Sequence, residues 1–136
     1  MEKEVVLVHV VAGAVIKKDN KYLLVQEKWE KVYGLWNFPA GRVDVGDTIE
    51  ETAIKEAREE TGFEVELIRK IGIHQETATE AVKHAFEVRI IGGELKFSPE
   101  ELLDAKWFTF EEIKNMKDKL RSNWILATIK ILEGEI

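Results

Sequence analysis

Three glutamates near the middle of the chain have the residue type and the spacing that a metal site requires. Glu56, Glu59 and Glu60 lie three and four positions apart, which makes their side chains neighbours on one face of a helix. Like charges at this spacing repel each other by roughly 0.2–0.5 kcal/mol per pair. A hard cation such as Mg²⁺ binds oxygen ligands and would convert this repulsion into binding. For the glutamates taken alone, an ordinary solvated helix face remains the alternative.

The segment around the glutamates carries further residues in a fixed order. It reads GRVDVGDTIEETAIKEAREETGF, with a glycine at its start, an acid at Asp47, a base at Lys55 and a second glycine near its end. It resembles the signature of the Nudix hydrolase family: Gly, five residues, Glu, seven residues, Arg-Glu, an apolar residue, any residue, Glu-Glu, any residue, Gly and an apolar residue. The positions that match directly are Gly41, Glu56, Ala57, Glu59, Glu60, Gly62 and Phe63.

Two positions depart from this signature while keeping their charge. Asp47 stands where the family has Glu, and Lys55 stands where it has Arg. Asp is one methylene shorter than Glu, and Lys is a point charge without the planar fork of Arg. We interpret Asp47 and Lys55 as groups that brace the glycine loop against the helix, outside the set of metal ligands. Pairing of Lys55 with Glu51 or Glu59 along the helix is the alternative.

The resemblance to the Nudix family, in its MutT-like form, carries expectations for the fold and the chemistry. It implies an α/β (α+β) architecture in which a mixed β-sheet is sandwiched between helices. It implies hydrolysis of a diphosphate linked to another group, with Mg²⁺ or Mn²⁺ as cofactor. The metal ligands it implies are the Gly41 carbonyl, Glu56, Glu59 and Glu60, and Glu56 and Glu59 are the candidate catalytic residues, with Glu56 as general base. A non-catalytic, nucleotide-binding regulatory module of the same fold is the alternative. Loss of the glutamates would mark such a module, and all three are present.

Other residues could complete the site. Many family members supply a further ligand or base from a loop that corresponds here to the acidic stretch 98–104. Glu100, Glu101 and Asp104 are candidates, with Glu101 or Asp104 preferred, and a helix-capping acidic turn is the alternative. Arg42 directly follows the first glycine and could contact a phosphate, or be a solvated surface residue. The remaining candidates are Trp36, which could stack on a heterocycle or pack under the loop, and His84, which could face the pocket or be structural.

The substrate class is less constrained by the sequence. Residues 35–41 (LWNFPAG) and 120–122 (LRS) resemble a small bacterial Nudix phosphatase that acts on a thiamine-precursor pyrimidine pyrophosphate and on nucleoside di- and triphosphates. Residues 77–80 contain neither the Pro nor the Tyr that marks subfamilies acting on ADP-ribose or dinucleoside polyphosphates. We therefore expect a nucleotide or a small heterocyclic pyrophosphate as substrate.

Length and composition set broader limits. A chain of 136 residues suits one domain over residues 1–136, with the Nudix signature at 41–63. A net charge of −6 argues against a nucleic-acid polymer as partner. The absence of cysteine excludes disulfides and thiolate chemistry. The apolar run 5–16 follows an acidic start and is too short to span a bilayer. It is rich in Val, so we expect a buried strand, no membrane contact and a cytoplasmic location. We also expect a monomer or homodimer.

The secondary structure predicted around the site is a helix at about 48–61, capped by Asp47 or Thr48 with Glu50 or Glu51 completing a capping box and stopped by Gly62. Ile49, Ala53 and Ala57 recur at four-residue spacing, so this helix buries one stripe and presents its glutamates on another. The strands are predicted at 5–17, 21–27, 64–75, 80–91 and 105–109, with a turn at 19–20, a turn at 92–93, a further strand starting at 94–97, and helices from 109 and at 124–132.

Overall fold

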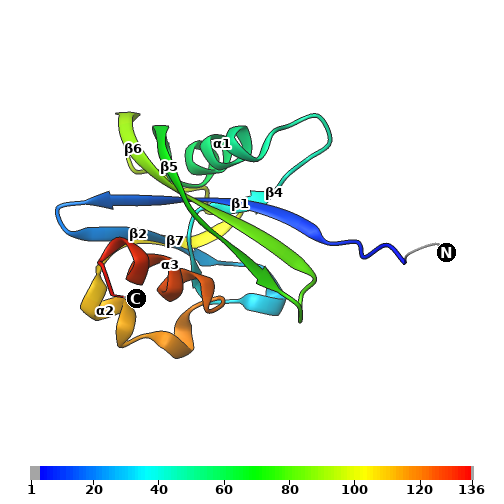
Figure 1. Cartoon of the computed structure of the whole chain (residues 1–136). Helices are drawn as coiled ribbons and strands as arrows, with labels where there is room; N and C mark the ends of the chain where they lie inside the picture. The colour runs from blue at the N-terminus through cyan, green and yellow to red at the C-terminus, as the bar shows by residue number, and fades with distance from the viewer. Residues whose placement is uncertain (1–3, 136) are drawn as a thin grey trace.

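The computed structural model describes residues 4–135, and there a mixed sheet lies between helices on its two sides (Figure 1). The strands are β1 (His9–Lys18), β2 (Lys21–Glu27), β3 (Trp36–Asn37), β4 (Ala40–Arg42), β5 (Phe63–Glu76), β6 (Ala81–Gly93) and β7 (Leu102–Thr109). The α-helices are α1 (Ile49–Thr61), α2 (Phe110–Lys114) and α3 (Trp124–Leu132), with 3-10 turns at Glu30–Val32 and Lys117–Lys119. This architecture confirms the expected mixed sheet between helical layers.

The order of the strands places β1 at the centre of the molecule. The strands follow one another as β3-β2-β1-β6-β5, with β4 paired to β1 and β7 paired to β2. The β1–β6 pair is parallel, whereas the other pairs are antiparallel. In the short β1–β4 pair, Gly41 lies opposite Ala12. The glycine that opens the signature is therefore fixed to the central strand by backbone hydrogen bonds.

Two hydrophobic clusters fill the space on either side of the sheet. On the side of α1, the small residues Ala53 and Ala57 are fully buried against strand residues that include Phe86, so this helix lies close to the sheet. On the side of α2 and α3, Trp124 and Ile125 pack in the second cluster. Successive strand residues point to opposite faces of a sheet, which is why neighbouring residues of one strand enter different clusters.

The start and the stop of α1 agree with the sequence-based expectation, but of the predicted capping box the structure shows only the hydrogen bond to the Thr48 hydroxyl. Thr48 is the N-cap, and its hydroxyl accepts a hydrogen bond from the Glu51 backbone N–H at 3.0 Å, which satisfies one of the free donors at a helix start. Gly62 ends the helix with φ at 82°, a left-handed conformation in which a Cβ would be strained. A complete capping box between Thr109 and Glu112 is present at the start of α2, the helix predicted from residue 109.

Some predicted boundaries were wrong. Residues 92 and 93 were predicted as a turn and belong to β6, because both pair with the start of β5; residues 94–97 form no strand. β7 begins at Leu102, so the predicted acidic loop is shorter than expected. β3 forms between residues 27 and 40, where no strand was predicted.

The prediction of a buried strand from residue 5 was wrong in its first part. β1 begins at His9, and Val5, Val6 and Leu7 are each about four-fifths exposed. Their partner strand explains the difference, since β6 begins at Ala81 opposite His9 and offers no backbone to pair with earlier residues. No helix within residues 4–135 has the length and apolar content needed to cross a bilayer.

Candidate functional site

The first contact in the candidate site is between Gly41 and Glu56. A Cβ atom placed on Gly41 would lie 2.3 Å from Oε1 of Glu56 and 2.4 Å from its Cδ. Only a glycine therefore lets the backbone of β4 approach the Glu56 carboxylate this closely. The sequence signature pairs these two positions, and the structure brings them into direct contact.

Glu60 lies one turn further along α1 and is buried, with 8% of its surface exposed. Its Oε2 accepts a hydrogen bond from the Ala40 backbone N–H at 3.1 Å. Burial is the largest of the causes that raise the pKa of Glu60 well above its usual range, followed by the hydrogen bond with Glu56 and the charges of Glu56 and Glu27. The pKa of Glu56 is also raised, chiefly by burial, while its hydrogen bond with Glu60 acts in the opposite direction.

This donor set suits a divalent cation. Two hydrogen-bonded carboxyl groups, one of them buried, lie beside the glycine loop of β4, and such oxygen atoms are the ligands that Mg²⁺ prefers. The close approach of Gly41 leaves the Glu56 carboxylate the space that a side chain would fill. As they stand, no three acidic or histidine side chains in the described part of the chain converge tightly enough to hold a metal ion. Glu59, which is exposed, would have to turn toward Glu56 and Glu60 to complete the set.

The acidic stretch before β7 approaches the same carboxylates. The charge of Glu101 is among the causes that raise the pKa of Glu56, which places Glu101 within electrostatic reach of α1. Asp104 is directed elsewhere, because its carboxylate accepts a hydrogen bond from the Ala105 backbone N–H at 2.8 Å and lies 3.7 Å from the Lys106 ammonium. Of the three acids considered in this stretch, Glu101 is thus the one that the structure relates to the glutamate helix, while Glu100 is exposed in the preceding turn.

The two positions that depart from the signature lie close together. The Lys55 ammonium is 3.9 Å from Oδ2 of Asp47 and 3.7 Å from Oδ2 of Asp44. Neither Glu51 nor Glu59 forms an ion pair with Lys55, although pairing along the helix was the alternative. Lys55 therefore connects α1 to the loop before it, and Asp44 is a partner that the signature did not indicate.

The aromatic and basic candidates have different environments. Trp36 is buried, and its ring packs edge-to-face on Phe108 with 4.9 Å between the centroids. That position agrees with the packing alternative, since a stacking surface for a ligand would need an open ring face. Arg42 is exposed and lines a cavity of about 340 Å³ together with Val43 and Ile49 beside the start of α1.

His84 is buried in β6, and its Nδ1 has no hydrogen-bond partner among the described residues. Burial lowers the pKa of His84, and the charge of Lys70 lowers it further while that of Glu50 raises it. By strand alternation His84 shares its face with Phe86, which belongs to the cluster beneath α1. The adjacent residue, Lys83, points to the other face.

Lys83 belongs to a group of polar residues that the sequence interpretation did not select. Lys83 is buried, and its ammonium lies 3.2 Å from Glu76 and 3.3 Å from the Ser122 hydroxyl. Nearby, Arg121 lies 3.5 Å from Glu27. A lysine at an inward position of a predicted strand was the available signal, because a buried charge needs a partner; its partners are distant in sequence and could not be assigned without the fold.

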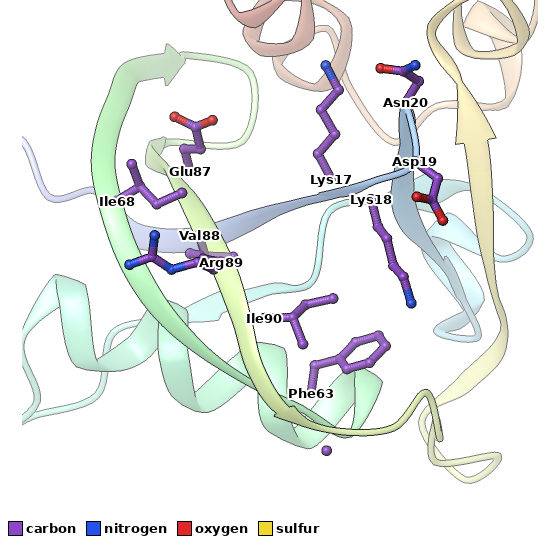
Figure 2. A pocket seen from close by; sticks show the side chains of 11 residues that line it. Lys17, Lys18, Asp19, Asn20, Phe63, Ile68, Glu87, Val88, Arg89 and Ile90 are labelled. Carbon is purple, nitrogen blue, oxygen red and sulfur yellow. The ribbon is translucent and has the colours of Figure 1, made fainter.

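Another cavity lies away from these residues. It has a volume of about 780 Å³ and is lined by the end of β1, the turn after it and parts of β5 and β6, with Ile90 and Phe63 on one side and Lys17 and Lys18 on another (Figure 2). None of the candidate ligands in α1 or β4 lines it. The candidate site is therefore at the glutamates, because their carboxylates can bind a cation, whereas the cavity is distinguished by its volume alone.

Comparisons with known proteins identify the family of this chain. The family model described as NUDIX domain matches residues 7–127. A candidate 8-oxo-dGTP diphosphatase of Bacillus subtilis (strain 168) is 37% identical over 93 residues, covering 68% of this chain and 60% of that protein. An ADP-ribose pyrophosphatase of Methanocaldococcus jannaschii is 32% identical over 111 residues, covering 79% of this chain and 63% of that protein.

Solved structures agree in fold. A NUDIX hydrolase from Nitrosomonas europaea superposes with a TM-score of 0.81 at 25% identity, covering 94% of this chain and 90% of that one. Among the curated relatives, the matched part spans from 32% to 63% of the length of the first proteins found. The shared part is therefore the region that contains the glutamate helix, and the longer relatives contain additional sequence.

Proposed function

Because the chain belongs to the Nudix hydrolase family, we propose that it is a pyrophosphohydrolase that cleaves a diphosphate linkage in a nucleotide or small heterocyclic pyrophosphate with the help of Mg²⁺ or Mn²⁺. The observation that carries the proposal is the contact of Glu56 with Gly41 and Glu60. Buried like-charged carboxyl groups at hydrogen-bond distance weaken a fold unless a cation or a proton separates them. Such an arrangement is typical of a site built for a ligand.

In this proposal the metal ligands are the Gly41 carbonyl, Glu56, Glu59 and Glu60. A divalent cation bound there would neutralise phosphate oxygens and lower the pKa of a water molecule. Burial of Glu60 and its hydrogen bond from the Ala40 backbone fix one carboxylate in place before any ligand binds. A preorganised carboxylate needs no reorganisation at the moment of reaction.

The remaining residues of the proposal act on the water and on the diphosphate. Glu56 is the candidate general base, with Glu59 and Glu101 as acids that can assist at the same site. Lys55 and Asp47 hold the glycine loop against α1 across 3.9 Å. Arg42 is exposed next to Gly41, so its guanidinium is free to approach a phosphate group from the β4 side.

The finer substrate assignment has one candidate from the sequence and two from relatives. The segments 35–41 and 120–122 resemble a phosphatase that acts on a thiamine-precursor pyrimidine pyrophosphate. The relatives compared above are a candidate 8-oxo-dGTP diphosphatase and an ADP-ribose pyrophosphatase. All of these substrates contain a diphosphate joined to a heterocycle or nucleoside, which is the class that we propose.

A screen of substrates tests this function. Purified protein is incubated with Mg²⁺ and, separately, with excess EDTA on a panel of nucleoside di- and triphosphates, ADP-ribose and thiamine-related pyrophosphates, and the products are identified. We expect metal-dependent release of a phosphorylated product from at least one member. Full activity in EDTA would contradict the metal assignment, and tight nucleotide binding without turnover of any member would favour the regulatory module.

A further inference from the structure

Arg121 and Glu27 form an ion pair that is open to solvent on one side. Nη1 of Arg121 lies 3.5 Å from Oε1 of Glu27, and the two side chains are 26% and 19% exposed. The Asn37 amide donates to the same Oε1 at 3.3 Å. Within residues 4–135 both contacts use Oε1, so Oε2 of Glu27 is available as an acceptor. The guanidinium has five N–H donors, most of which remain available beside it.

The surrounding contacts hold this pair in place. The Arg121 backbone N–H donates to the Trp36 carbonyl at 2.7 Å. The Trp124 indole N–H donates to Oδ1 of Asn37 at 3.0 Å, and Trp124 is buried. Asn37 is therefore fixed by a buried ring, and it in turn fixes Glu27. A donor and an acceptor held side by side in this way form a preorganised recognition edge.

The charge of Glu27 reaches both the glutamate helix and a second ion pair. The charge of Glu27 acts on Glu60 in α1 and on Lys83 in β6. Lys83 is itself paired with Glu76 at 3.2 Å. Arg121–Glu27 and Lys83–Glu76 are thus two ion pairs, each of balanced charge. Their charges balance, so a ligand that brought an additional charge would leave one partner unpaired in a partly buried place.

We propose that the Arg121–Glu27 pair selects the non-phosphate part of the substrate, and that it favours a neutral ring whose edge presents a carbonyl oxygen beside an N–H group. The guanidinium would donate to the carbonyl, and Oε2 of Glu27 would accept from the N–H. Oxo-purine and oxo-pyrimidine rings present such an edge, whereas a ring with an amino group beside a bare ring nitrogen presents donor and acceptor in reverse order. This inference rests on the proposed function, because it concerns the group attached to the diphosphate.

Four nucleoside triphosphates that differ in the ring alone provide the test. GTP and UTP carry the oxo edge, while ATP and CTP carry the amino edge, and the phosphate groups are the same. We expect kcat/KM with Mg²⁺ to be higher for GTP and UTP by about tenfold or more, as for one well-made hydrogen bond to a charged group. The difference is expected mainly in KM, because ring contacts are the same in the ground state and the transition state.

Substitutions separate recognition from folding. Arg121→Lys keeps the positive charge next to Glu27 but removes the planar fork, so it is expected to fold and to bring the oxo-to-amino ratio near one. Glu27→Gln, which adds an N–H donor, is expected to act in the same direction. The matched control is Arg69→Lys, in the exposed Arg69–Glu87 pair of β5 and β6 at 3.0 Å, which is expected to leave the ratio unchanged.

The outcomes distinguish this inference from the proposed function. Equal kcat/KM for the four nucleotides in the unsubstituted protein, or an unchanged ratio in Arg121→Lys, would overturn the recognition edge while leaving the hydrolase proposal intact. Absence of hydrolysis throughout the panel would overturn the hydrolase proposal. In that case, equilibrium binding of the same four nucleotides, measured by titration calorimetry, decides whether the edge discriminates between the rings.

Discussion

The two charged regions that meet at Glu27 are built on opposite principles. In α1 and the strand beside it, Glu56 and Glu60 share a hydrogen bond, and further acids at Glu59 and Glu101 act on Glu56. In the region before α3, each charge has a partner of opposite sign, at 3.2 Å in Lys83–Glu76 and at 3.5 Å in Arg121–Glu27. The first region concentrates negative charge, whereas in the second region negative and positive charges are paired with each other.

This difference indicates which region is suited to binding a cation. Like charges on neighbouring helix positions are destabilising, and a buried carboxyl group loses hydration without gaining an opposite charge. A fold that keeps such a group gives up stability for binding or catalysis. Substitutions should therefore have opposite signatures in the two regions: loss of activity without loss of stability in α1, and loss of stability or selectivity where the charges are paired.

The largest loss of activity is expected from substitution of Glu59 or Glu60. Glu59→Gln is expected to lower metal-dependent hydrolysis by about 10²–10³-fold, the scale observed when one preorganised electrostatic group is removed. The midpoint of thermal unfolding should not decrease, since the substitution removes a like charge from an exposed position. Glu60→Gln should lower hydrolysis to a similar extent. Steady-state kinetics and thermal unfolding by circular dichroism measure the two quantities.

The matched control for these glutamates is Glu51→Gln, which changes an exposed residue of the same helix at its first turn. It is expected to keep the activity of the unsubstituted protein. If Glu51→Gln and Glu59→Gln reduced hydrolysis equally, general charge on α1 and not a ligand set would explain the effect, and the contrast between the two regions would fail.

A smaller effect is expected from Gly41→Ala. The added Cβ would meet the end of the Glu56 side chain at 2.3 Å, and a flexible side chain can move aside at little cost in folding free energy. The displaced carboxylate would then leave its position in the site, so activity should fall by about tenfold or more, in keeping with the sensitivity of catalysis to small misplacements. Gly72→Ala is the control, because no atom lies within 4 Å of a Cβ placed there.

A still smaller loss of activity is expected when the ion pair between Lys55 and the loop before α1 is removed. Lys55→Ala should reduce activity while the protein remains folded, and Lys55→Arg should be tolerated because the charge is kept. A double-mutant cycle with Asp47→Ala should give a coupling free energy of about 0.2–1 kcal/mol, the range for partly exposed pairs. Absence of coupling would point to Asp44, at 3.7 Å, as the effective partner.

Much of the α1 region could be predicted from the sequence because its determinants are local. The N-cap Thr48, the stop at Gly62 and the buried stripe of Ala53 and Ala57 all lie within one helix. Propensity, capping and four-residue spacing are sufficient for such a segment. Gly41 and Glu56 were both named as metal ligands from the signature, whereas their close approach became visible only in the structure.

The paired region could not be predicted because its partners are far apart in sequence. Lys83 meets Ser122 across 39 positions, and Arg121 meets Glu27 across 94. Strand alternation indicates that a residue points inward, but it does not show which distant side chain lies opposite. The same limit explains the error at residues 5–8, where an apolar run predicted a strand and the length of β6 decided its start.

The smallest expected effect belongs to a third set of paired charges, where Glu133 follows α3. Its Oε2 accepts hydrogen bonds from the Tyr22 hydroxyl and from the Lys17 ammonium, the latter at 3.1 Å. These two hydrogen bonds hold the pKa of Glu133 below its usual range. A carboxyl group with a lowered pKa in the folded state stabilises that state above the ordinary glutamate pKa of about 4.3, and this stabilisation is lost as the pH falls through the lowered value.

Glu133→Gln should therefore unfold at a lower temperature than the unsubstituted protein at neutral pH, and the difference should shrink as the pH is lowered below the ordinary glutamate pKa. Thermal unfolding at a series of pH values measures the difference. Glu30→Gln, at an exposed position without an ion pair among the described residues, should show no such pH dependence. If the difference between Glu133→Gln and the unsubstituted protein stayed constant with pH, packing of the Glu133 side chain and not its charge would stabilise this part of the fold. Paired charges would then not explain the difference in stability between this region and α1.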